Sequence, residues 1–209
     1  MALEATHIRI ALAVKDQMEI TDLKRYVSGT IYPDSRNVTG IRRELTHCAF
    51  PGGTTDATTD FDKGWYIHLL VDEIQKRLHD QLFGSVLPNT SGTNDWIVYS
   101  ALKIIQDMQD YADRETQLSI KQLEMFDNPS GEDAALLAEY YSFIKDFYHK
   151  SDNYTCSDYI EIWSGLNVTD DLVTQIIQQA ESLHKDDSIT QEIASVYDLT
   201  VEEIVSAVK

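Results

Sequence analysis

Cysteine is scarce in this chain: Cys48 and Cys156 are the two present among 209 residues, far apart and without C-x-x-C spacing. Such a pair does not build a disulfide framework, so we expect a reducing compartment. The sequence also lacks any run of about 18 or more apolar residues, the length that a membrane-spanning helix needs. Its first residues have neither a basic segment nor a small-residue cleavage site, so they do not form a signal peptide. These absences predict a cytoplasmic protein that does not enter a membrane.

Basic residues are also few. The chain has 17 Lys and Arg against 35 Asp and Glu, a formal net charge of -18. A general nucleic-acid-binding protein needs a basic face for the phosphate backbone, and docking on anionic lipid needs one too. The charge therefore predicts no nucleic-acid partner and no membrane partner, and it raises the local concentration of cations.

Alternating apolar and polar residues, which indicate strands, are absent, and apolar residues recur at helical spacing instead. Hydrophobic residues make up 43% of the chain, an ordinary share for a globular protein. We expect an all-α fold, a multi-helix bundle in which residues 1–209 form a single domain. The predicted helices cover 5–18, 21–30, 59–83, 94–111, 132–149 and 169–184, with short ones at 157–164, 190–197 and 200–208.

A long segment between the second and third predicted helices, residues 31–60, differs from the rest. It holds prolines at positions 33 and 51 and glycines at positions 40, 52 and 53. It predicts an extended loop with one short turn around residues 42–47. A loop of this length inside a compact domain usually has a functional reason. We expect it to present ligands.

His68 and Asp72 stand four residues apart on the predicted helix 59–83, so their side chains leave the same face one turn apart. An imidazole nitrogen and a carboxylate oxygen at this spacing can bind one cation at roughly 2.0–2.2 Å. Alone, such a pair on a helix is more often a simple surface hydrogen bond than a metal site. Its flanks are apolar on nearly every side, however, and a buried ionisable pair needs compensation. Adding Asp34 and His47 from the loop gives two His and two carboxylates, which suit zinc, iron or manganese.

Three segments then resemble one family. They are YVSGTIYPD ending at Asp34, Thr46-His47, and FDKGWYIHLLVD containing His68 and ending at Asp72. In this order they are similar to the bacterial zinc-dependent phospholipase C group, which includes cytoplasmic members. That group also has an early His on its first helix, and His7 fits that place. The resemblance covers about residues 5–80. The group's third metal position needs a His-rich segment after the His68 helix, where this chain has His79 alone.

The resemblance implies a helical fold with a clustered metal site and hydrolysis of a small phosphorylated substrate. Asp34, His47, His68 and Asp72 would hold one divalent metal, with zinc expected first. Asp72 would bridge to a second metal held partly by His7. A free carboxylate would serve as general base, and Glu73 and Asp60 are the nearest candidates.

Several alternatives stay open at this stage. His7 is equally well explained as a hydrogen-bonded core histidine. Arg36 is a candidate for binding a substrate phosphate by paired hydrogen bonds, yet it and its basic neighbours in the loop are equally explained as solvated charges. His79-Asp80 is the literal pair of HD-domain nucleotide phosphohydrolases, which here would need His47 and a later carboxylate such as Asp146. Finally, the chain can be a non-catalytic helical protein with a structural metal site.

Overall fold

The computed structural model describes residues 2–47, 56–84 and 93–208. These parts of the chain are helical with no strand, which confirms the all-α prediction. The N-terminal helices are α1 (Glu4–Val14), α2 (Leu23–Ile31), η1 (Tyr32–Ser35), α3 (Arg36–Thr39) and α4 (Arg43–Thr46). The middle of the chain forms α5 (Asp60–Phe83), α6 (Thr93–Tyr111), α7 (Arg114–Ile120) and α8 (Ala134–His149). The C-terminal part forms η3 (Cys156–Tyr159), α9 (Ile160–Gly165), α10 (Asp170–Leu183) and α11 (Asp187–Ala207).

The N-terminus of α5, the longest described helix, is defined by a capping box. The Thr59 side chain accepts a hydrogen bond from the Asp62 backbone N–H, and the Asp62 carboxylate accepts one from the Thr59 N–H. Two backbone donors that a helix start leaves free are satisfied in this way. Because this cap fixes where α5 starts, it also fixes which face carries His68 and Asp72.

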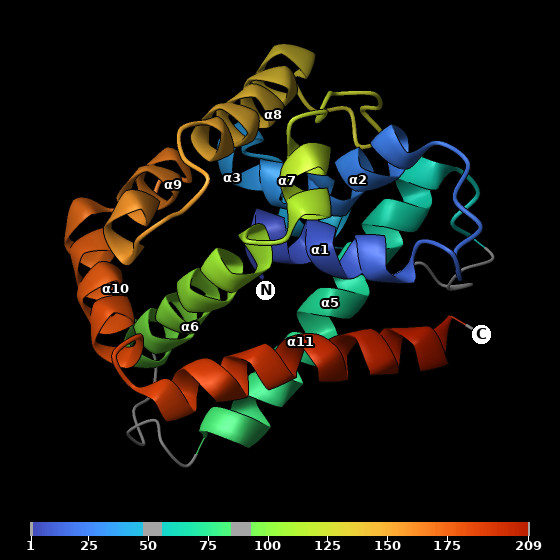
Figure 1. Cartoon of the computed structure of the whole chain (residues 1–209). Helices are drawn as coiled ribbons and strands as arrows, with labels where there is room; N and C mark the ends of the chain where they lie inside the picture. The colour runs from blue at the N-terminus through green and yellow to red at the C-terminus, as the bar shows by residue number, and fades with distance from the viewer. Residues whose placement is uncertain (1, 48–55, 85–92, 209) are drawn as a thin grey trace.

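Helix α1 lies at the centre of the bundle (Figure 1) and packs against α2, α5, α6, α7 and α11. Its residues are buried on almost every side; Ala13 is exposed and Arg9 half-buried. A helix surrounded in this way has no solvent face for polar side chains. Glu4, Thr6 and His7, all buried on α1, must therefore find partners inside the molecule.

Helices α2 and α5 cross with their backbones in contact. A Cβ atom on Gly29 would lie 2.0 Å from the Phe61 carbonyl oxygen, and one on Gly64 would lie 2.0 Å from the Tyr26 carbonyl oxygen. No larger residue fits at either position without moving a helix, because real Cβ contacts are not that short. The crossing brings the end of α2 directly against the face of α5 that carries His68.

Three details of the predicted elements were wrong. Residues 31–47 are not an extended loop: η1, α3 and α4 occupy most of them, although the turn predicted at 42–47 coincides with α4. The two short helices predicted at 190–197 and 200–208 are one helix, α11. Helix α7 was not predicted. Residues 48–55 of the predicted loop lie outside the described residues.

No described helix combines the length and the apolar character needed to cross a lipid bilayer. Cys156 is a buried free thiol, and Cys48 lies outside the described residues.

Candidate metal centre

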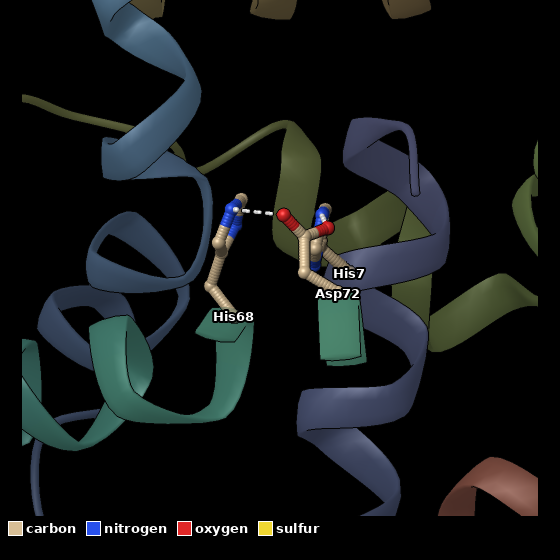
Figure 2. A group of neighbouring side chains, drawn as sticks. All are labelled: His7, His68 and Asp72. Carbon is tan, nitrogen blue, oxygen red and sulfur yellow. Dashed lines mark ion pairs between the residues drawn. The ribbon is translucent and has the colours of Figure 1, made fainter. Parts of the chain in front are cut away.

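Three buried side chains from two helices form the centre of the site (Figure 2). His68 and Asp72 leave α5 one turn apart, as their spacing predicts, and His7 reaches them from α1. The imidazole rings of His7 and His68 stack with their centroids 3.8 Å apart and an interplanar angle of 13°. Both histidines are fully buried, and Asp72 is 9% exposed.

The α2–α5 crossing orients His68. Its Nδ1 lies 2.8 Å from the carbonyl oxygen of Thr30, in the last turn of α2. A carbonyl oxygen accepts hydrogen bonds and donates none, so Nδ1 carries the proton and Nε2 keeps its lone pair. Nε2 has no hydrogen-bond partner among the described residues. This is the arrangement of a metal-binding histidine, whose second nitrogen usually donates to a carbonyl or carboxylate.

His47 follows α4, and two contacts position it. The indole Nε1 of Trp65 on α5 donates to the carbonyl oxygen of Thr46 at 2.6 Å, which ties α4 to α5. The Thr46 hydroxyl oxygen lies 2.9 Å from Nδ1 of His47. The His47 Nε2 atom is buried and has no hydrogen-bond partner within the described ranges.

The distances between these groups are those of ligands around a shared ion. Nε2 of His47 lies 3.7 Å from Oδ1 of Asp34 and 3.6 Å from Oδ2 of Asp72. Nε2 of His68 lies 3.7 Å from Oδ2 of Asp72. Hydrogen bonds would be about 2.7–3.2 Å. Ligand atoms about 2.0–2.2 Å from one tetrahedral ion stand about 3.3–3.6 Å apart. These three distances are longer than hydrogen bonds and close to the separation of ligand atoms around one tetrahedral ion.

A second group shares two of these residues. Nε2 of His7 lies 3.5 Å from Oδ1 of Asp72, the other carboxylate oxygen, which also accepts a hydrogen bond from the Ala2 backbone N–H at 3.2 Å. The ligand atoms of His7, His68 and Asp72 all lie within 4.8 Å of one another, as do those of Asp34, His47 and His68. Two overlapping triads meet at His68.

The surroundings favour the protonation states that metal ligands need. Burial lowers the pKa of His7 well below its usual value, and the adjacent His68 lowers it further. Burial also lowers the pKa of His68, although the carboxylates of Asp72 and Asp34 oppose this. Burial alone would raise the pKa of Asp72, but the charges of neighbouring groups, among them His68 and His7, bring it well below the usual range. Neutral imidazoles beside an ionised carboxylate are the metal-binding forms.

The predicted catalytic residues are distributed differently. Arg36, the first residue of α3, is half-buried and lies next to the cluster, as described below. The carboxylate of Asp60 instead accepts hydrogen bonds from the backbone N–H groups of Thr21 and Asp22, at the start of α2. Glu73 is exposed on α5. Neither carboxylate belongs to the metal-binding groups found in the described residues.

The HD-type set does not come together. His79 is buried on α5, whereas Asp80 is exposed and accepts a hydrogen bond from the Tyr99 hydroxyl at 2.5 Å. Asp146 is exposed on α8. No metal-binding group among the described residues contains any of the three.

A cavity of about 120 Å³ adjoins the cluster, and Asp34 and Arg36 are among the residues that line it. Three more lining residues come from distant elements and were not predicted: Trp96 and Lys103 on α6, and Trp163 on α9. Burial lowers the pKa of Lys103, and the carboxylates of Asp72 and Asp34 oppose that shift. In the sequence, the one indication that Lys103 is unusual is that it is a lysine among apolar residues of the predicted helix 94–111.

No protein-family model matches the chain, and neither a curated protein nor a solved structure matches it. The resemblance to the zinc-dependent phospholipase C group therefore stays a prediction based on its three motifs.

Proposed function

We propose that this chain is a metal-dependent phosphoester hydrolase whose ion is held by Asp34, His47, His68 and Asp72. The observation that carries the proposal is the set of three ligand-to-ligand distances of 3.6–3.7 Å that link these four side chains. Zinc suits a set of imidazole and carboxylate ligands, and iron or manganese are alternatives.

The chain's own residues perform three tasks in this proposal. Thr30 and Thr46 hold the rings of His68 and His47 with their Nε2 atoms toward the shared space. Asp72 offers one oxygen to that space and the other toward His7. A divalent cation bound there would activate water at neutral pH and neutralise charge on a phosphoryl group. Because Asp34 lines the adjoining cavity, a small substrate can reach the ion without the ligands moving apart.

Metal analysis of the purified full-length chain tests the binding step. We expect bound zinc, iron or manganese in the wild type and its loss in the double variant His68→Ala, Asp72→Ala. Glu73→Ala is the matched control, because Glu73 neighbours Asp72 on α5 yet is exposed. Unchanged metal content in the double variant would disprove the assignment. Loss of metal in Asp80→Ala alone would favour the HD-type alternative.

Hydrolysis is tested separately on a panel of phosphomonoesters and phosphodiesters with metal-loaded protein. Turnover that disappears in His68→Ala and persists in Glu73→Ala supports the proposal. A full metal complement together with inertness toward the whole panel would instead indicate a structural metal site with four protein ligands.

A further inference from the structure

The cavity beside the metal-binding cluster concentrates hydrogen-bond donors with no protein acceptor. Lys103 is 7% exposed, and no hydrogen bond or ion pair is seen for its ammonium group among the described residues. Trp163 is 6% exposed, and its buried indole Nε1 has no hydrogen-bond partner in that part of the chain. The buried Nε of Arg36 likewise has none. All three residues line the same cavity.

Donors left without partners inside a protein are costly, and native structures rarely keep several together without a ligand or water. Here the donors include two cations in a chain with a net charge of -18. Both cations lie next to Asp34, a member of the proposed metal site. Two of the 17 basic residues of this acidic chain line one small cavity, and their positive charge favours binding of an anion there.

The charges of the site favour an anion that carries two negative charges. The carboxylates of Asp34 and Asp72 are balanced by one divalent cation. The positive charges of Lys103 and Arg36 then remain. A phosphate monoester ends in a phosphoryl group that is mostly dianionic near neutral pH, since its second pKa is about 6. A phosphodiester has a single charge and would leave one of these cations without a partner.

The volume and the remaining lining limit the rest of the ligand. A cavity of about 120 Å³ is smaller than the roughly 300–1,000 Å³ typical of drug-sized ligands. Besides the donors and Asp34 and Asn37, the cavity is lined by the apolar side chains of Ala2, Leu3, Trp96, Leu166 and Val168. The rings of Trp96 and Trp163 meet edge to face, with their centroids 5.8 Å apart. The part of the ligand beyond the phosphoryl group must therefore be small and largely apolar.

We propose that the cavity lined by Arg36, Lys103 and Trp163 binds the dianionic phosphoryl group of a small phosphate monoester. This assignment rests on the proposed hydrolase function, because the proposed metal ion balances the carboxylates of Asp34 and Asp72 and leaves Lys103 and Arg36 to bind an anion. It names the substrate class that the function alone leaves open, and it excludes polynucleotides and phosphodiesters as substrates.

Calorimetric titration of the metal-loaded, full-length protein tests this at a pH above the second pKa of both dianionic probes, inorganic phosphate and methylphosphonate. Dimethyl phosphate serves as the monoanionic probe. We expect both dianions to bind and dimethyl phosphate to bind at least about tenfold more weakly. Equal affinity for dimethyl phosphate would overturn the preference for a dianion. Binding of inorganic phosphate with exclusion of methylphosphonate would assign the cavity to free phosphate and overturn the monoester proposal.

Variants locate the binding. Lys103→Met keeps the length of the side chain and removes its charge, and we expect it to weaken phosphate binding about ten- to a hundredfold, as loss of a charge-assisted hydrogen bond does. Lys121→Met, at an exposed lysine, is the matched control and should leave the affinity unchanged. Trp163→Phe keeps an aromatic ring at this position but removes the indole N–H donor, and it should weaken phosphate binding several-fold.

Circular dichroism establishes whether each variant is folded. If Lys103→Met does not fold, Arg36→Gln, at a half-buried position, provides a second variant that removes a charge. Phosphate affinity that is unchanged in a folded charge-removing variant overturns this inference and leaves the hydrolase proposal standing. Loss of metal binding is scored separately in the His68→Ala, Asp72→Ala protein, so the two proposals fail in distinguishable ways.

Discussion

Helix α1 carries polar side chains into two buried regions that are satisfied in different ways. On one side, Asp107 of α6 accepts hydrogen bonds from the Thr6 backbone N–H and from the hydroxyls of Tyr148 and Tyr159. On the other side, the Nε2 atoms of His7 and His68 have no such partner among the described residues. Both regions are fully buried, so solvent does not account for the difference.

The contrast distinguishes a polar group that its own chain satisfies from the groups that the proposed metal would satisfy. Asp107 has enough donors from its own chain, and it needs no ion to remain inside the protein. The Nε2 atoms of His7 and His68 stand 3.5 and 3.7 Å from the oxygens of Asp72, which is longer than a hydrogen bond. Three experiments test whether the two regions differ in this way.

The largest effect is expected from Asp107→Ala. This change leaves two tyrosine hydroxyls and one backbone N–H without an acceptor, and we expect it to lower the free energy of unfolding by about 3–5 kcal/mol. Urea denaturation measures this. Metal content should stay at the wild-type value in the folded protein. Loss of metal in parallel with the loss of stability would show that the two regions are not independent.

Removing the metal should have the next largest effect. With metal present at a hundred times its dissociation constant, chelation should lower the free energy of unfolding by about 2.7 kcal/mol. Thermal melts with and without chelator should then differ by about 5–11 °C for a chain of this size. His68→Ala should lose this chelator sensitivity, whereas Asp107→Asn should keep it. A chelator effect of equal size in His68→Ala would place the stabilising metal elsewhere.

The smallest effect is the pH dependence of the Asp107 region. Burial raises the pKa of Asp107 to about 6, against which the tyrosine hydrogen bonds act. Because the folded-state value lies above the unfolded one, the stabilising contribution is complete below the unfolded pKa of about 3.9 and is lost as pH rises through about 6.

The wild type should therefore lose about 2 kcal/mol relative to Asp107→Asn between about pH 4.5 and about pH 7.5. Urea denaturation of both proteins at these pH values measures the difference. A difference that is constant with pH would show that Asp107 does not titrate in this range.

Local signals accounted for much of the fold. The start of α5 was predicted within one residue because Thr59 and Asp62 form a cap that depends on neighbouring residues alone. The break predicted before residue 200 was wrong because Thr200, which resembles a helix cap, donates its hydroxyl to the Val196 carbonyl inside α11. Helix α7 has a local signal that was overlooked: Asp113 accepts a hydrogen bond from the Thr116 N–H.

Some residues of the candidate site can be predicted from neighbouring sequence, and others are brought together only by tertiary packing. His68 and Asp72 were predictable because helical geometry alone brings them together. Lys103 and Trp163 were not, because they lie about 60 residues apart in sequence and meet at the cavity only through the packing of α6 and α9. No pattern within either segment indicates that they line the same cavity.

The central position of α1 also determines when the site can exist. His7 lies on α1, and α1 packs against α6 and α11, two helices that are far from it in the sequence. Contacts this distant in sequence form late, because the intervening chain must first give up conformational freedom. Until then the apolar surface of α1 has no cover, and transiently exposed apolar surface favours aggregation. A metal ion that needs both His7 and His68 would therefore bind only after these contacts have formed.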